Sequence, residues 1–156
     1  MEIVLAAVGR LRPSLRAAAD DYRLRLQRYL RVSEREVREA SRQPTLSAQR
    51  AEEARRLRGV LPPRAVVVAL TRAGAGWTSA ELAGVLARWQ RDARPVALLL
   101  GGSEGLDPGL LAEAGQRWSL GPLTLPHELA RVVVYEQLYR ACSILRGEPY
   151  HKGAGP

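Results

Sequence analysis

The chain has 156 residues, 46% of them hydrophobic, and a net charge of +8. This length is typical of one domain, so residues 1–156 are expected to fold as a single unit whose core needs no disulfide or metal. No apolar run approaches the roughly 20 residues of a membrane span. The single cysteine excludes an intramolecular disulfide. We therefore expect a cytoplasmic protein without membrane contact.

Positive charge is concentrated in the first part of the chain. Residues 1–62 contain 14 arginines and eight acidic residues, which gives +6 of the total of +8. A basic surface attracts polyanions and speeds their encounter, so the charge favours contact with nucleic acid. Arginine makes up 23 of the 24 basic residues, and a GC-rich genome would produce the same bias without a nucleic-acid partner. Charge therefore indicates a class of partner and carries no information about the fold.

The first 62 residues alternate between apolar runs typical of strands and amphipathic stretches typical of helices. Gly9 ends the first apolar run, Pro44 lies in a polar loop, and Gly59 ends the second helix. The predicted elements are a strand over 2–8, a helix over 13–30, an edge strand over 32–40, a loop over 41–47 and a helix over 48–57.

The remaining residues continue the alternation, which indicates an α/β fold with a mostly parallel sheet. Gly74 and Gly76 are interpreted as a flexible loop. The predicted elements are buried strands over 65–70 and 96–100, a helix from a capping box at 78–81 to residue 92, a helix beginning at Asp107 and Pro108, a short strand over 118–120 and a last helix over 127–146.

A glycine-rich turn over 101–105 follows the strand over 96–100. It lacks the spacing of a dinucleotide-binding loop, because Ser103 and Leu106 occupy two of the glycine positions, and it lacks the Gly-Lys-Ser/Thr of a P-loop. The turn still lets backbone N–H groups approach a ligand at the carboxyl end of a strand, where open α/β sheets bind ligands. Taken alone, such a turn is more often an ordinary connection between a strand and a helix.

The sequence argues against metal catalysis and gives no support for a serine hydrolase. One cysteine and two distant histidines do not make a zinc pattern, so no metal is expected. Cys142 lies in the last predicted helix and is interpreted as a small core residue. No Gly-x-Ser-x-Gly sequence, the nucleophile elbow of many hydrolases, is present.

Two further stretches are unusual. Residues 120–127 place a glycine and two prolines among apolar residues, which would give either a loop entering the last helix or a rigid wall for a purine. The segment 149–152 groups an aromatic, a titratable and a cationic side chain near the end of the chain. Terminal polar segments are usually disordered, but tyrosine can stack on a base and lysine can pair with phosphate.

Several motifs occur together, in order, along essentially the whole chain. They are Leu-Leu-Leu-Gly-Gly-Ser-Glu-Gly-Leu at 98–106, Trp-Ser-Leu at 118–120, Leu-Thr-Leu-Pro-His at 123–127, Leu-Tyr-Arg-Ala at 138–141 and Pro-Tyr-His-Lys at 149–152, with Ala-Ala-Val-Gly at 6–9 in the first strand. In this combination the chain resembles the RlmH family, bacterial large-subunit ribosomal RNA (pseudouridine-N3)-methyltransferases of the SPOUT superfamily.

The resemblance implies a SPOUT-type α/β fold, with a mostly parallel sheet, helices on both faces and a C-terminal trefoil knot. It implies S-adenosyl-L-methionine as methyl donor, a homodimer, and as substrate a pseudouridine in an interface stem-loop of 23S ribosomal RNA, helix 69, on the assembled 70S ribosome. One subunit's donor pocket would be completed by the other's C-terminal tail. The expected donor-site residues are Leu70, Gly101, Gly102, Leu120, Gly121, Pro122, Leu123, Thr124 and Leu125.

The resemblance also suggests roles at the RNA. N3 of pseudouridine is a weakly acidic nitrogen that attacks well only after losing its proton, and a nearby cation can stabilise the anion. Arg140 or His151 is expected to favour that deprotonated base, with Tyr150 and Lys152 positioning the RNA. His127 is a second candidate base and RNA contact.

Each of these roles has a structural alternative. Arg140 could simply pair with Glu136, four residues earlier on the same helix. His127 could be only the residue that begins a helix after Pro126. The roles at the RNA therefore stay hypotheses at this stage.

The sequence departs from the family pattern at few positions, and two other functions stand beside the one that the resemblance implies. Ser103 replaces a proline common in the glycine turn, and Lys152 stands where some members have arginine, which loses bidentate phosphate contact but keeps the charge. One alternative is a SPOUT methyltransferase that acts on transfer RNA or another ribosomal RNA site. The other is a non-catalytic ribosome-binding protein. The motif at 149–152 and the lack of an added RNA-binding domain argue against the first alternative. The intact glycine turn and the intact motif at 149–152 argue against the second.

Overall fold

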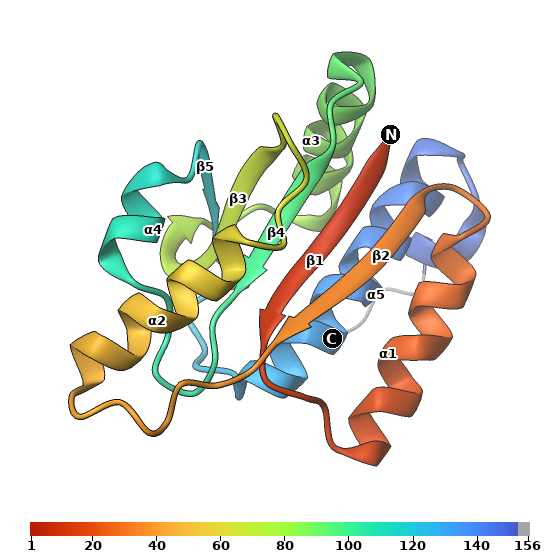
Figure 1. Ribbon diagram of the computed structural model, residues 1–156. Helices are drawn as coiled ribbons and strands as arrows, with labels where there is room; N and C mark the ends of the chain where they lie inside the picture. Colours follow the sequence, from red (N-terminus) through yellow and green to blue (C-terminus); the bar gives the residue numbers. More distant parts are fainter. Residues whose placement is uncertain (153–156) are drawn as a thin grey trace.

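The structure is a computed structural model that describes residues 1–152, with side chains described through Tyr150. Strands and helices alternate along the chain, as expected (Figure 1). The elements are β1 (Glu2–Val8), α1 (Pro13–Leu26), β2 (Arg31–Val37), α2 (Leu46–Arg58), β3 (Val66–Ala75), α3 (Ser79–Asp92), β4 (Val96–Leu100), α4 (Pro108–Glu113), β5 (Gln116–Trp118), α5 (His127–Leu145) and a 3-10 helix, η1 (Pro149–Lys152).

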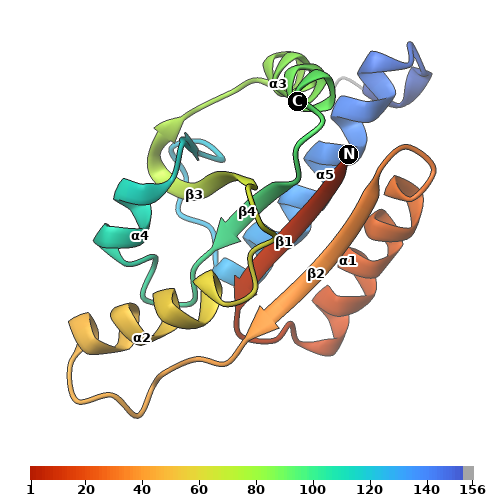
Figure 2. The same ribbon diagram turned by 45° about the horizontal axis from the view of Figure 1, so that its top comes forward.

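The strands form one sheet in the order β2-β1-β4-β3-β5, and every pair of neighbours is parallel. The α/β class and the parallel sheet predicted from the sequence are therefore confirmed. The charged strand β2 lies at one edge, also as expected. Figure 2, which brings the top of the molecule forward, shows the strands side by side with α5 running behind them.

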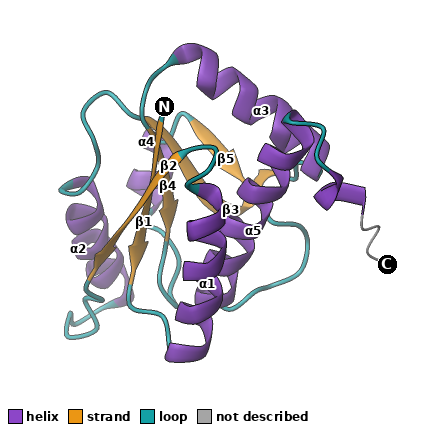
Figure 3. Cartoon of the chain, turned by 90° about the vertical axis from the view of Figure 1, so that its right-hand side faces the viewer, coloured by secondary structure: helices purple, strands orange, loops and turns teal. Residues whose placement is uncertain are grey.

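Helices cover both faces of the sheet (Figure 3). Alternate residues of β1 mark the two faces: Ile3 and Leu5 pack in the larger core with α1, α3 and α5, whereas Ala6 and Val8 pack in a smaller core with α2 and α4. All four of these side chains are buried. This alternation explains why β1 is apolar throughout, because a strand buried on both faces has no polar side.

Strand β3 is longer than predicted, and the prediction of a loop at Gly74 is wrong. The strand continues to Ala75, and both Leu70 and Ala75 pair with Trp118 of β5, so the residues between them bulge out of register. A Cβ atom on Gly74 would lie 2.7 Å from the backbone of Arg117 and Trp118. Gly74 therefore allows the backbones of β3 and β5 to approach closely, whereas the sequence analysis interpreted this glycine as part of a flexible loop.

Other boundaries also differ from prediction: β2 ends at Val37, three residues before the predicted end, and α2 begins at Leu46, two residues earlier than predicted. Helix α1 ends at Leu26, four residues early, and the chain turns through Tyr29 and Leu30, whose amide nitrogens donate to the Leu26 carbonyl. Leu30 remains buried after the turn, which is why the helical spacing of apolar residues continued past the helix end. Strand β5 covers Gln116–Trp118 instead of 118–120.

The helix starts follow the sequence signals closely. Thr78 and Glu81 form the predicted capping box, with the Glu81 amide donating to Thr78 Oγ1 over 3.2 Å and the Thr78 amide donating to Glu81 Oε2 over 2.7 Å. Asp107 caps α4 by accepting hydrogen bonds from the amides of Gly109 and Leu110. No helix in the described part of the chain is long and apolar enough to cross a membrane.

Candidate functional site

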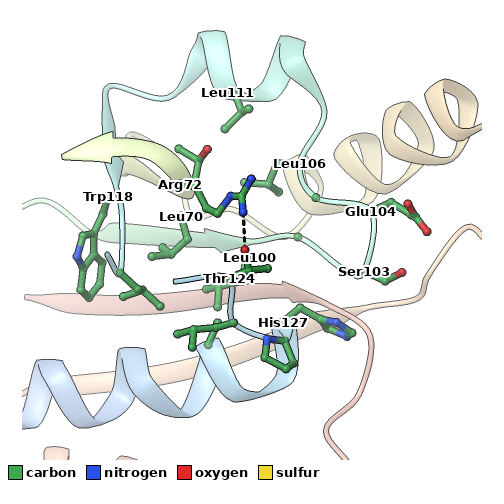
Figure 4. A pocket seen from close by; sticks show the side chains of 18 of the residues that line it. Leu70, Arg72, Leu100, Ser103, Glu104, Leu106, Leu111, Trp118, Thr124 and His127 are labelled. Carbon is green, nitrogen blue, oxygen red and sulfur yellow. Dashed lines mark hydrogen bonds between the residues drawn. The ribbon is translucent and has the colours of Figure 1, made fainter. Parts of the chain in front are cut away.

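A pocket of about 800 Å³ lies beyond the carboxyl ends of β3 and β4, next to the start of α5 (Figure 4). Its walls are mainly leucine side chains and glycine backbone, with Trp118 on the side of β5. This volume falls within the range of about 300–1,000 Å³ that small-molecule pockets occupy. The pocket lies where parallel α/β sheets bind ligands, at the ends of neighbouring strands.

The glycine turn (101–105) forms one wall of the pocket, and its shape requires glycine at two positions. A Cβ atom on Gly101 would lie 2.7 Å from the Gly105 carbonyl carbon and 2.9 Å from its oxygen. Gly105 has a φ of +78° and its amide donates to the Gly102 carbonyl over 3.1 Å. The turn therefore folds back tightly on itself and presents backbone, not side chains, to the pocket.

Arg50 of α2 holds the glycine turn from outside. Its Nε donates to the Glu104 carbonyl over 2.7 Å, and the residue also lines the pocket. Fifty-four residues separate the two partners in sequence, so no local pattern could have identified Arg50 as part of the site.

The segment 119–126, here called the pocket loop, forms the opposite wall. Its start is tied to β3, since the Ser119 amide donates to the Ala75 carbonyl over 2.8 Å and the buried Ser119 hydroxyl bridges the backbone of Gly121. Arg72, from the bulged part of β3, donates to the Thr124 hydroxyl across the pocket, as the dashed line in Figure 4 marks. The pocket loop is thus held by β3 at two points, Ala75 and Arg72.

Eight of the nine residues expected at the donor site line this one pocket. Pro122 is the exception: it is exposed and is not among the lining residues. His127, expected to contact RNA, also lines the pocket, at the first position of α5. The eight residues that the structure brings together are Leu70, Gly101, Gly102, Leu120, Gly121, Leu123, Thr124 and Leu125.

Sequence reasoning missed part of the lining. Arg72 follows Leu70 by two residues and could have been noticed as a cation next to the strand end. Thr71, Leu111 and Ala130 carried no comparable signal, because residues of these types are common in any fold. Their place in the site follows only from the packing of β3, α4 and α5 around the pocket.

A buried charge network fixes the start of α5. Arg131 is 1% exposed; its Nη2 donates to the Gly9 carbonyl over 2.9 Å and its Nη1 to Glu36 Oε2 over 2.9 Å. Glu34 also accepts hydrogen bonds from Arg16 Nη2, over 2.6 Å, and from the Tyr135 hydroxyl, over 2.6 Å. The network ties α5 to the ends of β1 and β2, and so holds the first turn of α5 beside the pocket.

Arg140 and Tyr150 meet at the other end of α5, around Glu136. Arg140 Nη2 donates to Glu136 Oε1 over 2.7 Å, the Tyr150 hydroxyl donates to the same oxygen over 3.1 Å, and the Arg140 guanidinium carbon lies 4.9 Å from the centre of the Tyr150 ring. The ion pair with Glu136 anticipated as the structural alternative is therefore present. Burial, helped by the hydrogen bond with Tyr22, raises the pKa of the Tyr150 phenol well above its usual value.

Within one chain, this second group of residues does not reach the pocket. His127 and Arg140 are thirteen residues apart on α5, which corresponds to about 20 Å along a helix that rises 1.5 Å per residue. His151 and Lys152 lie beyond the residues whose side chains are described, so the structure does not test their expected roles. In the described part of the chain no three His, Cys, Asp or Glu residues group as metal ligands would.

Comparison with known proteins identifies the family. A family model described as "Predicted SPOUT methyltransferase" matches residues 1–151. Ribosomal RNA large subunit methyltransferase H of Anaeromyxobacter sp. (strain Fw109-5) is 46% identical over 97% of this chain and 100% of its own length. The protein of the same name from Paraburkholderia xenovorans (strain LB400) is 41% identical over 97% of this chain and 99% of its own. The chain belongs to the RlmH family of SPOUT methyltransferases.

Solved structures agree with this membership at the level of the fold. A probable methyltransferase from Bordetella pertussis Tohama I superposes with a TM-score of 0.56 at 19% identity, covering 90% of this chain and 95% of that one. A probable methylase family protein from Haemophilus influenzae Rd KW20 gives a TM-score of 0.52 at 13% identity, covering 99% of this chain and 71% of that one. The RlmH-family chain therefore shares its sheet and helix arrangement with proteins of very different sequence.

Proposed function

We propose that this protein is a methyltransferase that uses S-adenosyl-L-methionine to methylate N3 of a pseudouridine in 23S ribosomal RNA. The substrate would be the interface stem-loop, helix 69, of the assembled 70S ribosome. The protein would act in the cytoplasm as a homodimer, with residues 1–156 as one domain. The observation that carries the proposal is the pocket, where eight residues expected from the family motifs meet in an RlmH-family chain.

The pocket is suited to a donor that combines a purine, a ribose and a charged amino-acid end. Leucine side chains from β3, β4 and the pocket loop offer apolar walls for a base, whereas the glycine turn offers backbone N–H and C=O groups. Gly101 and Gly102 line the pocket without side chains, so the backbone at this wall can approach a ligand closely. When bound, S-adenosylmethionine supplies an activated methyl group attached to a sulfonium.

The main task of the residues around the pocket is orientation. Holding two reactants at the correct angle and distance can lower the activation barrier by several kcal/mol. Arg72 fixes Thr124 of the pocket loop, and Arg50 fixes Glu104 of the glycine turn, so both walls are held by side chains from other elements. These contacts would keep the donor in one position while the acceptor base enters.

The acceptor side would be supplied by the group around Glu136. A cation beside the base stabilises the negative charge left when N3 loses its proton. Arg140 is one candidate, because it is already oriented by Glu136 and by the Tyr150 ring; His151 is the other. Tyr150 and Lys152 would position the RNA. His127 would act as base or RNA contact from the pocket itself.

The separation of these two groups supports the proposed homodimer. Arg140 lies about 20 Å along α5 from His127, so one chain cannot place both at one base. Two copies related by a two-fold axis would solve this, because each could present its C-terminal segment to the other's pocket. The trefoil knot is part of the same proposal: family membership suggests that the pocket loop and the glycine turn belong to knotted segments.

The function is tested by offering methyl-labelled donor with 70S ribosomes, isolated 50S subunits, and transfer RNA in separate reactions. Label on 70S ribosomes, mapped by mass spectrometry of the digested 23S RNA to N3 of a pseudouridine, is the expected result. Label on transfer RNA or at another ribosomal site would instead support a different SPOUT substrate. Tight ribosome binding without label would support a non-catalytic role.

The shared site is tested by mixing two inactive variants. Gly101→Val should disable the pocket and Arg140→Met the acceptor side. A mixed dimer has one site with both defects and one with neither, so denaturing and refolding the two variants together should restore methyl transfer. Each variant refolded alone is the control. If the mixture stays as inactive as its components, the pocket and the acceptor group belong to the same chain or to no common site.

A further inference from the structure

Four of the five tyrosines of the chain gather where α5 ends, although they are up to 128 residues apart in sequence. Tyr139 of α5 lies at the centre, with its ring centroid 4.7 Å from that of Tyr150, 5.9 Å from Tyr29 and 6.3 Å from Tyr22. In Figures 1 and 2 the end of α5 and η1 lie beside the turn between α1 and β2, which contributes Tyr29. We call these four residues the tyrosine cluster.

Arginines and carboxylates surround the rings. The guanidinium of Arg25 lies 5.5 Å from the Tyr22 ring and 5.9 Å from the Tyr139 ring, and that of Arg146 lies 5.9 Å from the Tyr29 ring. Cations at these distances from aromatic faces are attracted to them. Together with Arg140 over Tyr150, they connect every ring of the cluster to a cation.

The hydroxyl groups tie the cluster to the segment that follows α5. Tyr29 donates to the Glu148 carboxylate, and this hydrogen bond raises the pKa of Tyr29 to about 12. Tyr150 donates to Glu136, and its hydroxyl also lies 3.5 Å from that of Tyr22. The turn and the 3-10 helix after α5 are therefore held by side chains from α1 and the turn after it, as well as from α5.

The backbone adds a second constraint just before the cluster. Gly147 has a φ of +67°, and the Glu148 amide donates to the Ser143 carbonyl over 2.9 Å, a pattern that ends a helix and turns the chain sharply. The direction of the following segment is thus set at Gly147 and again at Tyr150. A segment that only had to end the fold would need neither the half-buried phenols nor the two carboxylate contacts.

We propose that Tyr139, supported by Tyr22 and Tyr29, is a positioning residue that holds Tyr150 and so aims the C-terminal segment at the RNA. This inference rests on the proposed function, in which Arg140, Tyr150 and the two residues after it meet the acceptor base. Tyr139 itself touches neither donor nor base. It acts through the edge-on contact of its ring with Tyr150.

The test compares Tyr139→Leu with Tyr139→Phe. Leucine removes the ring, whereas phenylalanine keeps it and removes only the hydroxyl. Ile144→Ala is the matched control, because Ile144 packs against the core at the same end of α5 and is not one of the rings of the cluster. Three quantities are measured for each variant: amide hydrogen exchange over residues 147–152 in the free protein, donor affinity, and the single-turnover rate of methyl transfer to 70S ribosomes.

We expect Tyr139→Leu to accelerate exchange over 147–152 and to lower the single-turnover rate by roughly 10- to 100-fold, as misplaced reacting groups do. Donor affinity should change much less than the rate, since the residues that line the donor pocket belong mainly to the glycine turn, the pocket loop and β3, which the substitution leaves intact. Tyr139→Phe should retain slow exchange and most of the rate. Ile144→Ala should lose stability without a comparable loss of rate.

Two results would overturn the inference. Wild-type exchange over 147–152 in Tyr139→Leu would mean that the ring does not hold the segment. Faster exchange with an unchanged rate would mean that the segment is held for stability alone. A wild-type protein that binds donor but methylates no ribosomal RNA is a different failure: it would remove the proposed function and the positioning role with it, while the exchange data would still report whether the cluster holds the segment.

Discussion

The two ends of α5 are built by different means. The first end, beside the pocket, is fixed by buried charges and by glycine backbone: Arg131 reaches the ends of β1 and β2, and Gly101 packs against Gly105 with no room for a side chain. The second end is fixed by half-buried rings and partly exposed ion pairs around Tyr139 and Glu136. A change at the first end should therefore affect folding and donor binding, and a change at the second should affect mainly the acceptor.

The largest effect is expected from removing the buried charge at the first end. Arg131→Met would leave Glu34 and Glu36 without their buried partner and should lower the free energy of unfolding by about 3–5 kcal/mol. Urea denaturation followed by circular dichroism measures this loss. Arg55→Met is the control, since the Arg55 side chain, which pairs with Glu52, is 71% exposed and should be replaced without a measurable change. Similar losses in both variants would show that the network is no more important than a surface pair.

The acceptor end should behave in the opposite way. Arg140→Met removes the cation beside Tyr150 and should reduce methyl transfer by roughly 100-fold, the effect of deleting one group that stabilises developing charge. Donor affinity, measured by calorimetry, should not change. Leu145→Ala, an exposed residue of the same helix end, is the control. Unchanged turnover in Arg140→Met would move the catalytic role to His151, whose replacement by alanine is the next variant.

Gly101→Ala tests the glycine wall with the smallest possible side chain. Its Cβ would come within 2.7 Å of the Gly105 backbone, and overpacking of this kind costs about 1–3 kcal/mol. The turn should open to relieve this contact, and donor binding would then have to close it again. Donor affinity should therefore fall by roughly 5- to 150-fold. Gly84→Ala is the matched control: a Cβ there meets only the Arg88 guanidinium, 4.0 Å away, and alanine favours the helix that contains it. Equal donor affinity in the two variants would mean that the turn does not shape the donor site.

The contrast between the two ends also explains what the sequence could predict. The strands β1 and β4 and the capping box at Thr78 follow from local patterns, because apolar runs and caps need no distant partner. The pocket residues were found through family motifs, and the glycine turn alone would have been read as an ordinary connection. The prediction at Gly74 was wrong because the backbone that requires a glycine there, that of β5, lies some forty residues away in sequence.

The contacts that fix α5 are equally non-local. Arg131 pairs with Glu36 across 95 residues, and Tyr29 bonds to Glu148 across 119. Composition shows that arginine is abundant, but nothing in the sequence around Arg131 separates it from the exposed arginines of α1 and α2. Only the packing of α5 against the sheet selects it. Residues of this kind therefore cannot be identified from a single sequence, even one with strong motifs.

The smallest expected effect concerns Cys142, which is buried at the second end of α5. Burial raises the pKa of its thiol from 9.0 to about 12, because the folded core disfavours the thiolate. The unfolded chain ionises first, so this group's contribution to stability is complete below about pH 9 and is lost as the pH rises toward 12. Between pH 8 and pH 10 the loss should be about 1 kcal/mol, measured by urea denaturation at each pH.

Cys142→Ala separates this loss from other alkaline effects. The variant should be less stable than wild type at pH 8, because it leaves a small cavity. The difference should shrink at pH 10, because only the wild type has a thiol, whose ionisation in the unfolded chain lowers the free energy of unfolding. Tyr29, whose pKa is also raised, titrates in both proteins and cancels from the comparison. A difference that stays constant from pH 8 to pH 10 would mean that the thiol reaches solvent in the folded state, and that the second end of α5 opens more readily than its packing implies.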